Sequence, residues 1–279
     1  MKKYIRGFLM AWGNFSAVPR PYHKWHEDSR KAMLAMLPLV GLMLAVIVCA
    51  AWWLLDLIGV HAILTGAVLT ALYFIANGFI HLDGFMDCSD AILSRRPELE
   101  ERQRILKASD VGAFAVISVM LMSIIFAASM MTLAEEFCLE KASMLVVIML
   151  VSRGFGADAV LRKTPMKTSQ YIDLDKEAEI ALEPDANKKK KAREQGALNL
   201  TLVIPLLAIY YISSAFEAGI MFAICHIAVV CIVALAAGGA GVYARKQLGG
   251  MNGDIAGYMV VMSETIGVFS AAILTSVLM

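Results

Sequence analysis

Seven apolar segments, each long enough to cross a lipid bilayer as a helix, dominate this chain. A hydrocarbon core about 30 Å thick needs about 20 apolar helical residues, and lipid-exposed backbone must satisfy its hydrogen bonds within the segment. With 59% hydrophobic residues, the composition is typical of membrane proteins. We therefore predict an all-α, polytopic membrane helix bundle in which residues 1–279 form one catalytic domain. The predicted spans are 33–57, 60–82, 110–133, 139–161, 197–215, 218–243 and 256–278.

The first 32 residues form a separate, polar N-terminal segment. Its apolar run, Phe8 to Trp12, is too short to span a bilayer, and no small-residue cleavage site of a signal peptide follows it. On a helix, apolar side chains share one face and basic side chains lie on the other. The apolar set is Met1, Tyr4, Ile5, Phe8 and Trp12. This pattern predicts a helix that lies in the membrane interface and contacts lipid.

Basic residues are distributed unevenly between the two predicted membrane faces. Residues 1–32, 83–109, 162–196 and 244–255 together hold 23 of the 25 Lys and Arg residues. The alternate connections hold only Lys141. By the positive-inside rule, the N-terminus is cytoplasmic and the C-terminus lies outside, which requires an odd number of spans.

The connection 162–196 is the long basic loop of the predicted cytoplasmic face. Its run Lys188–Lys191 has two interpretations, a solvated loop or a contact with anionic headgroups or substrate phosphate. The net charge of +1 gives no field for binding nucleic acid. The five cysteines form no CxxC or zinc-binding pattern. A homo-oligomer is compatible with the sequence.

The polar segment after the second predicted span carries the chemistry that stands out most. Asp83, Asp87 and Asp90 are spaced i, i+4, i+7, so on a helix they form one stripe. Three like charges there repel one another unless a cation lies among them. Carboxylate oxygens are ligands for Mg²⁺, and Mg²⁺ commonly serves phosphate chemistry. The alternative is an ordinary acidic helix end in water.

Two further motifs lie on the same predicted face. Ser109 to Gly112 precedes the third span, and Gly249 to Asp254 precedes the seventh. Glycines that open a helix leave backbone N–H groups free to bind phosphate. Asp254 is a candidate metal ligand that could share Mg²⁺ or a diphosphate with the acidic stripe. Its alternative role is to cap the seventh helix.

Ionisable side chains also fall inside or beside predicted spans. Arg153 lies about 12 Å and Glu264 about 15 Å from the cytoplasmic helix ends at 1.5 Å per residue, so they can pair with each other. Such charges usually face a bundle interior or a wet cavity, and Arg153 could instead bind phosphate. His81 lies about 160° from the stripe on an ideal helix, unless Gly84 bends the segment.

The order of these motifs resembles that of the adenosylcobinamide-GDP ribazoletransferase family, the cobalamin-5′-phosphate synthases of the B12 pathway. The resemblance covers nearly the whole chain. It rests on these segments: Pro38 to Gly41, His81 to Asp90, Ser109 to Gly112, Ser152 to Gly154, Gly249 to Asp254, and Glu264. It implies a prokaryotic cytoplasmic-membrane enzyme whose partners are adenosylcobinamide-GDP and α-ribazole or α-ribazole 5′-phosphate.

The resemblance also implies roles for individual residues in a Mg²⁺-dependent displacement of GMP. The implied metal ligands are Asp83, Asp87, Asp90 and Asp254. The implied catalytic residues are Asp83, Asp87, Asp90, Arg153 and His81. The implied substrate-binding residues are Ser109, Gly112, Arg153, Gly250, Asn252, Gly253 and Glu264. Diphosphate displacement depends mainly on positioning and charge neutralisation, which suits this set. Asp87 or Asp90 could accept the proton of the nucleophile.

The chain departs from the family pattern at several positions. Ala91 stands where glycine is usual, Asp110 where a basic residue is usual, and Asn252 where threonine is common. Asp110 puts a phosphate contact at that position in doubt. Two other enzyme classes, CDP-alcohol phosphotransferases and intramembrane prenyltransferases, also use aspartate-rich helix ends. A transporter with a midplane ion site is the alternative that is not an enzyme.

Overall fold

The computed structural model describes residues 2–22, 24–171 and 219–278, and every element in these ranges is helical apart from one isolated bridge between Pro165 and Met251. The helices are α1 (Lys2–Phe15), η1 (Glu27–Ser29), α2 (Arg30–Ala35), α3 (Leu37–Leu57), α4 (Ala62–Ala76), α5 (Ile80–Leu93), α6 (Leu99–Leu106), α7 (Ala113–Leu133), α8 (Leu139–Arg162), α11 (Gly219–Leu248) and α12 (Gly253–Leu278). This confirms the all-α prediction.

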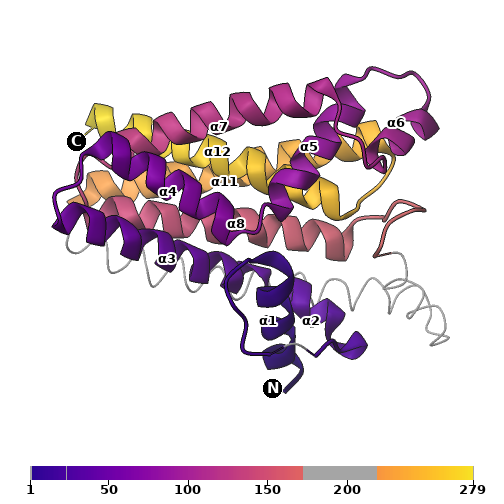
Figure 1. Cartoon of the computed structure of the whole chain (residues 1–279), viewed down its shortest axis with the longest axis horizontal. Coiled ribbons are helices and arrows are strands. Elements are labelled where there is room, and N and C mark those ends of the chain that lie inside the picture. The colour runs from indigo at the N-terminus through magenta and orange to yellow at the C-terminus, as the bar shows by residue number, and fades with distance from the viewer. Residues whose placement is uncertain (1, 23, 172–218, 279) are drawn as a thin grey trace.

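Long apolar helices run side by side and form the bundle (Figure 1). In the part of the chain that the structure describes, five helices are long and apolar enough to cross a membrane, so the chain is a multi-pass membrane protein. These are α3, α7, α8, α11 and α12, and they correspond to five of the predicted spans. The predicted span 197–215, and with it most of the loop 162–196, lies outside the described residues.

The segment 60–82, predicted as one span, is not one continuous helix. Helix α4 ends at Ala76, and α5 begins at Ile80 after a bend of 86°. With 15 residues, α4 is about 22 Å long and too short to cross the bilayer alone. Gly78 and Phe79, both with left-handed backbone conformations, form the bend. If the bent pair is one span, the described residues contain six candidate spans.

Helix α8 lies at the centre of the bundle and is the most buried of the candidate spans. It packs against α3, α11 and α12, and its residues Met144 to Val151 form much of the main apolar core. In contrast, α7 presents exposed apolar side chains such as Ile117, Met120 and Ile124. Such a surface suits contact with lipid tails.

The N-terminal helix predicted from the sequence is present as α1. Its small residues Gly7 and Ala11 pack closely, and a methyl group added at Gly7 would lie 2.7 Å from the carbonyl carbon of Ala32. Tyr4 and Ile5 remain exposed. Helices α1 and α2 lie beside the bundle, across the direction of its long helices (Figure 1).

Candidate active site

The acidic stripe lies on α5, as the spacing predicted. Asp83 is exposed, and Asp87 and Asp90 are partly buried on the same side of the helix. None of these three carboxylates forms a hydrogen bond or an ion pair with another described residue. The stripe therefore presents negative charge that no described cationic side chain balances.

Helix α12 meets α5 at close backbone distance, which brings Asp254 to the stripe. A methyl group added at Gly84 would lie 2.8 Å from the Cα of Asp254, and one added at Gly257 would lie 2.9 Å from the carbonyl oxygen of His81. Asp83, Asp90 and Asp254 all interact electrostatically with Asp87. The two acidic motifs thus converge, although they lie far apart in the sequence.

Gly84 has a different role from the one considered in the sequence analysis. The bend precedes α5, at Gly78 and Phe79, and α5 continues as an unbroken helix through Gly84. The absence of a side chain at Gly84 instead allows α12 to approach. His81 is therefore not turned toward the stripe by a bend at Gly84.

Asn252, and not Asp254, caps the N-terminus of α12. The side-chain oxygen of Asn252 accepts a 2.9 Å hydrogen bond from the backbone N–H of Ile255, which is the usual capping geometry. Its side-chain nitrogen donates a 2.6 Å hydrogen bond to a carboxylate oxygen of Asp254. The capping role considered for Asp254 is wrong, because Asn252 fills it and also orients the Asp254 carboxylate.

The glycine-rich turn before α12 is fixed by the segment that follows α8. The N–H of Met166 donates to the carbonyl of Met251, and the N–H of Met251 donates to that of Thr164, both at 2.9 Å. A methyl group at Gly250 would lie 2.8 Å from the backbone nitrogen of Met166. Gly250 is thus required by backbone packing. Its predicted contact with substrate, like that of Gly253, stays a prediction.

Gly112 closes the other side of the stripe. It is the residue before α7, and a methyl group added there would lie 2.1 Å from a carboxylate oxygen of Asp90. A side chain at position 112 would therefore displace the Asp90 carboxylate from the place that it occupies. Ser109 lies in the exposed turn that precedes Gly112. A substrate contact of either residue stays a prediction.

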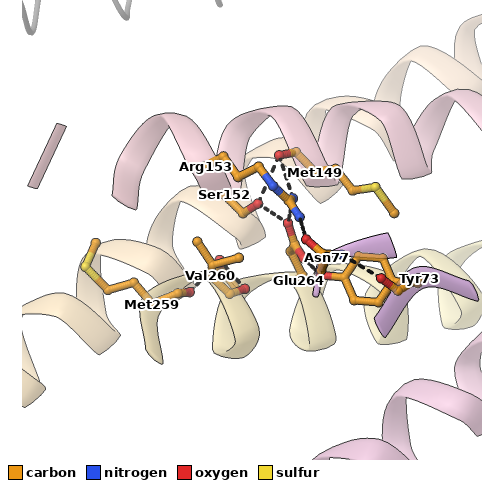
Figure 2. A network of polar contacts seen from close by, with 9 residues as sticks. Tyr73, Asn77, Met149, Ser152, Arg153, Met259, Val260 and Glu264 are labelled. Carbon is orange, nitrogen blue, oxygen red and sulfur yellow. Dashed lines mark hydrogen bonds and ion pairs between the residues drawn. The ribbon is translucent and has the colours of Figure 1, made fainter. Parts of the chain in front are cut away.

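Arg153 and Glu264 form an ion pair in the interior, as their similar depth allowed (Figure 2). Both side chains are almost completely buried. Glu264 also accepts hydrogen bonds from the hydroxyl groups of Tyr73 and Ser152. The second terminal nitrogen of Arg153 donates to the side-chain oxygen of Asn77 at 2.6 Å. The pair thus belongs to a network that joins α4, α8 and α12.

Arg153 occupies a space that α3 leaves open. A methyl group added at Gly41 would lie 2.7 Å from the Cδ of Arg153. The guanidinium also donates to the carbonyl of Met149 at 3.1 Å. A contact of Arg153 or Glu264 with substrate stays a prediction, and for Arg153 it would require the guanidinium to leave this ion pair.

His81 faces the N-terminal helix. Its ring is buried and stacks on Phe15, with 6.1 Å between ring centroids. Its Nε2 atom has no hydrogen-bond partner in the part of the chain that the structure describes. These contacts place the ring between α5 and α1. A catalytic role for His81 stays a prediction.

Comparison with known proteins agrees with the resemblance seen in the sequence. The model of the family described as cobalamin-5-phosphate synthase matches residues 7–272, which is nearly the whole chain and includes every motif named above. The chain belongs to the cobalamin-5-phosphate synthase family.

Curated relatives of this family cover the chain from end to end. An adenosylcobinamide-GDP ribazoletransferase of Clostridium botulinum strain Alaska E43 is 31% identical over 275 residues, 99% of this chain and 100% of the relative. One of Clostridium perfringens strain 13 is 28% identical over 274 residues, 98% of this chain and 100% of the relative. No solved structure matches the chain.

Three residues that contribute to this architecture were absent from the sequence analysis. Tyr73 and Asn77 bond to the buried ion pair, and Gly257 allows α5 to cross α12. Gly257 follows Asp254 by one helical turn, which is a signal that the sequence did contain. Asn77 precedes Gly78, and an Asn-Gly pair is typical of turns, but Tyr73 carried no comparable signal because its partner lies far away in the sequence.

Proposed function

We propose that this protein is an adenosylcobinamide-GDP ribazoletransferase. Family membership across the chain supports this function, and the name of the relatives supports adenosylcobinamide-GDP and a ribazole as substrates. The observation in the structure that carries the proposal is the convergence of Asp254 on the acidic stripe of α5. A bundle end where the three stripe carboxylates have no partner among the described residues suits the handling of a diphosphate together with a cation.

The proposed reaction is a displacement at phosphorus. A hydroxyl oxygen of α-ribazole, or of its 5′-phosphate, attacks the cobinamide-bearing phosphorus of adenosylcobinamide-GDP. The bond from that phosphorus to the bridging oxygen breaks, and GMP leaves with the electron pair. Asp87 or Asp90 accepts the proton of the hydroxyl, since partly buried carboxylates without a described partner suit a general base.

We further propose that Asp83, Asp87, Asp90 and Asp254 form the set of carboxylates from which Mg²⁺ takes its protein ligands. Among the described residues, no three acidic, histidine or cysteine side chains are gathered tightly enough to enclose a metal ion. Mg²⁺ needs no such enclosure, because it keeps several waters and uses one or two carboxylates together with phosphate oxygens. The oxygen-only donors at this end therefore fit Mg²⁺ that arrives with a diphosphate. Bound there, it would neutralise diphosphate charge.

The glycine-rich turn and the buried residues have supporting roles in this proposal. Asn252 orients Asp254 through the 2.6 Å hydrogen bond. Gly250 and Gly253 shape the turn beside it, and Gly112 leaves room for Asp90. We also propose that this end faces the cytoplasm of a prokaryotic inner membrane. Cysteines placed at Ser109 and Lys246 should be labelled from the cytoplasm, and one at Ser276 from outside.

Turnover of the purified protein tests the function directly. The protein in lipid nanodiscs is incubated with adenosylcobinamide-GDP, α-ribazole and Mg²⁺, and GMP and the corrinoid product are quantified. We expect stoichiometric GMP and cobalamin formation that stops when EDTA is added. Absence of GMP from a folded, monodisperse preparation with either ribazole substrate would contradict the proposed activity. Turnover that persists in EDTA would contradict the role of Mg²⁺ alone.

A further inference from the structure

A buried polar network ends at the bend between α4 and α5, the point that sets the direction of the acidic stripe. Asn77 closes α4, and its side-chain oxygen accepts the 2.6 Å hydrogen bond from Arg153. Its side-chain nitrogen donates to the carbonyl of Tyr73 at 2.7 Å. Asn77 is also almost completely buried. One side chain therefore ends the helix and attaches its end to α8.

The bend needs such support because its backbone conformation is unfavourable. Phe79 has a φ of 58°, a region that bulky residues rarely adopt. A residue in such a conformation persists only when its surroundings hold it there. Phe79 is half exposed, so its own side chain contributes little packing. The restraint must come from the residues on either side of the bend.

The N-terminal segment holds the bend from the other side. The backbone N–H of Ala17 donates a 2.8 Å hydrogen bond to the carbonyl of Ala76, the last residue of α4. The ring of Phe15 stacks on His81 in the first turn of α5. The bend is thus fixed between the N-terminal segment and the interior network.

The interior network continues from the bend to the helix that carries Asp254. Arg153 bonds Asn77 with one terminal nitrogen and Glu264 with the other (Figure 2). Glu264 belongs to α12, the helix that begins beside Asp254. The guanidinium is therefore a single group that links the bend before α5 to α12. It does so through two buried, charge-assisted hydrogen bonds.

We propose that Arg153, acting through Asn77 and Glu264, is a positioning residue that fixes the direction of α5 relative to α12. Its function is to hold Asp83, Asp87 and Asp90 opposite Asp254, without touching the substrate. The effect on turnover rests on the proposed function, whereas the effect on helix geometry does not. A small displacement of reacting groups is enough to cost about 100-fold in rate.

The first test cuts the link at Asn77 and leaves the ion pair intact. We expect Asn77→Ala to lower kcat about 100-fold with little change in KM. Asn77→Asp keeps the oxygen that accepts from Arg153, so it should restore most of the activity. Tyr73→Phe is the matched control, since it removes a buried hydrogen bond to Glu264 from the same helix but leaves the link at the bend.

Equal losses of kcat in Asn77→Ala and Tyr73→Phe would overturn the proposal, because the network would then be only structural. No loss in Asn77→Ala would overturn it as well. Asn77→Ser, whose hydroxyl is too short to reach the guanidinium, replaces the alanine variant if that variant does not fold.

A distance measurement tests the geometry without turnover. Spin labels are placed at Leu93 on α5 and Phe269 on α12, both exposed, in a background without native cysteines. We expect one narrow distance distribution in the parent and in Tyr73→Phe, and a broadened or shifted one in Asn77→Ala. An unchanged distribution in Asn77→Ala would contradict the positioning role even if the substrate were a different diphosphate.

Discussion

Charged side chains are paired in the interior of the bundle but have no described cationic partner at its acidic end. In the interior, Arg153 and Glu264 pair with each other and bond to neighbouring polar groups. At the end, Asp83, Asp87 and Asp90 crowd together without a cationic partner among the described residues. Buried charge is tolerated when the protein itself satisfies it. Charge left unsatisfied at an accessible site is available to a ligand, and this difference separates a structural role from a catalytic one.

Removing a charge from the acidic end should have the largest effect on turnover. We expect Asp87→Asn and Asp83→Asn each to lower kcat about 10⁴-fold, or about 5.4 kcal/mol of transition-state stabilisation. Thermal stability should stay the same or rise, since repulsion along the stripe is reduced. Steady-state GMP release and thermal unfolding of the same preparations measure the two effects. Near-normal activity of either variant at saturating Mg²⁺ would contradict a catalytic role for the substituted aspartate.

Removing a charge from the interior should act first on stability. Arg153→Met leaves Glu264 buried without its partner and should cost about 3–5 kcal/mol. The double variant Arg153→Met/Glu264→Met removes both charges and should recover much of that loss. Unfolding in SDS titrations measures both. If the single variant were as stable as the parent, Glu264 would not depend on the buried ion pair with Arg153.

The contact between α5 and α12 should be the next most sensitive feature. Gly84→Ala places a methyl group 2.8 Å from the Cα of Asp254, so the two helices must separate. We expect a loss of about 100-fold in kcat from the displaced carboxylates. Gly238→Ala on α11 is the matched control, because no atom lies within 4 Å of the added methyl group. Equal activities of the two variants would show that the close crossing is unimportant.

The smallest expected effect separates the cap from the ligand at the start of α12. Asn252→Ala should lower stability by about 1 kcal/mol, the usual cost of a lost cap. Asp254→Asn should leave stability almost unchanged, because Asp254 does not cap the helix. Thermal unfolding of both variants shows which of the two residues caps α12. A larger loss of stability in Asp254→Asn than in Asn252→Ala would contradict the assignment of Asn252 as the cap.

Sequence reasoning predicted features that depend on local periodicity or on apolar length. The stripe on α5, the five long helices and the depth that allows Arg153 to meet Glu264 all follow from helical spacing. The bend at Gly78 does not follow from helical spacing, because apolar residues continue on both sides of it. Hydropathy measures how apolar a segment is and says nothing about the direction of the helix axis. The partners Tyr73 and Asn77 depend on how distant helices pack, which a single sequence does not reveal.

The choice between Asn252 and Asp254 as the cap shows a finer limit. Both residue types are good caps, so the decision depends on where α12 begins, and sequence alone places a helix end only to within about two to four residues. The structure begins the helix at Gly253 and thereby leaves the Asp254 carboxylate beside the acidic stripe. This two-residue difference in the start of α12 changes Asp254 from a structural residue into a candidate ligand.

Binding of Mn²⁺, used as a spectroscopic substitute for Mg²⁺, tests the central claim that α5 and α12 contribute to one site. Free Mn²⁺ is measured by EPR in titrations of the parent, Asp83→Asn and Asp254→Asn, with GDP present as the diphosphate. We predict that each substitution weakens Mn²⁺ binding at least about tenfold, about 1.4 kcal/mol, although the residues belong to different helices. Unchanged Mn²⁺ affinity in Asp254→Asn, with weakened binding in Asp83→Asn, would contradict a shared site.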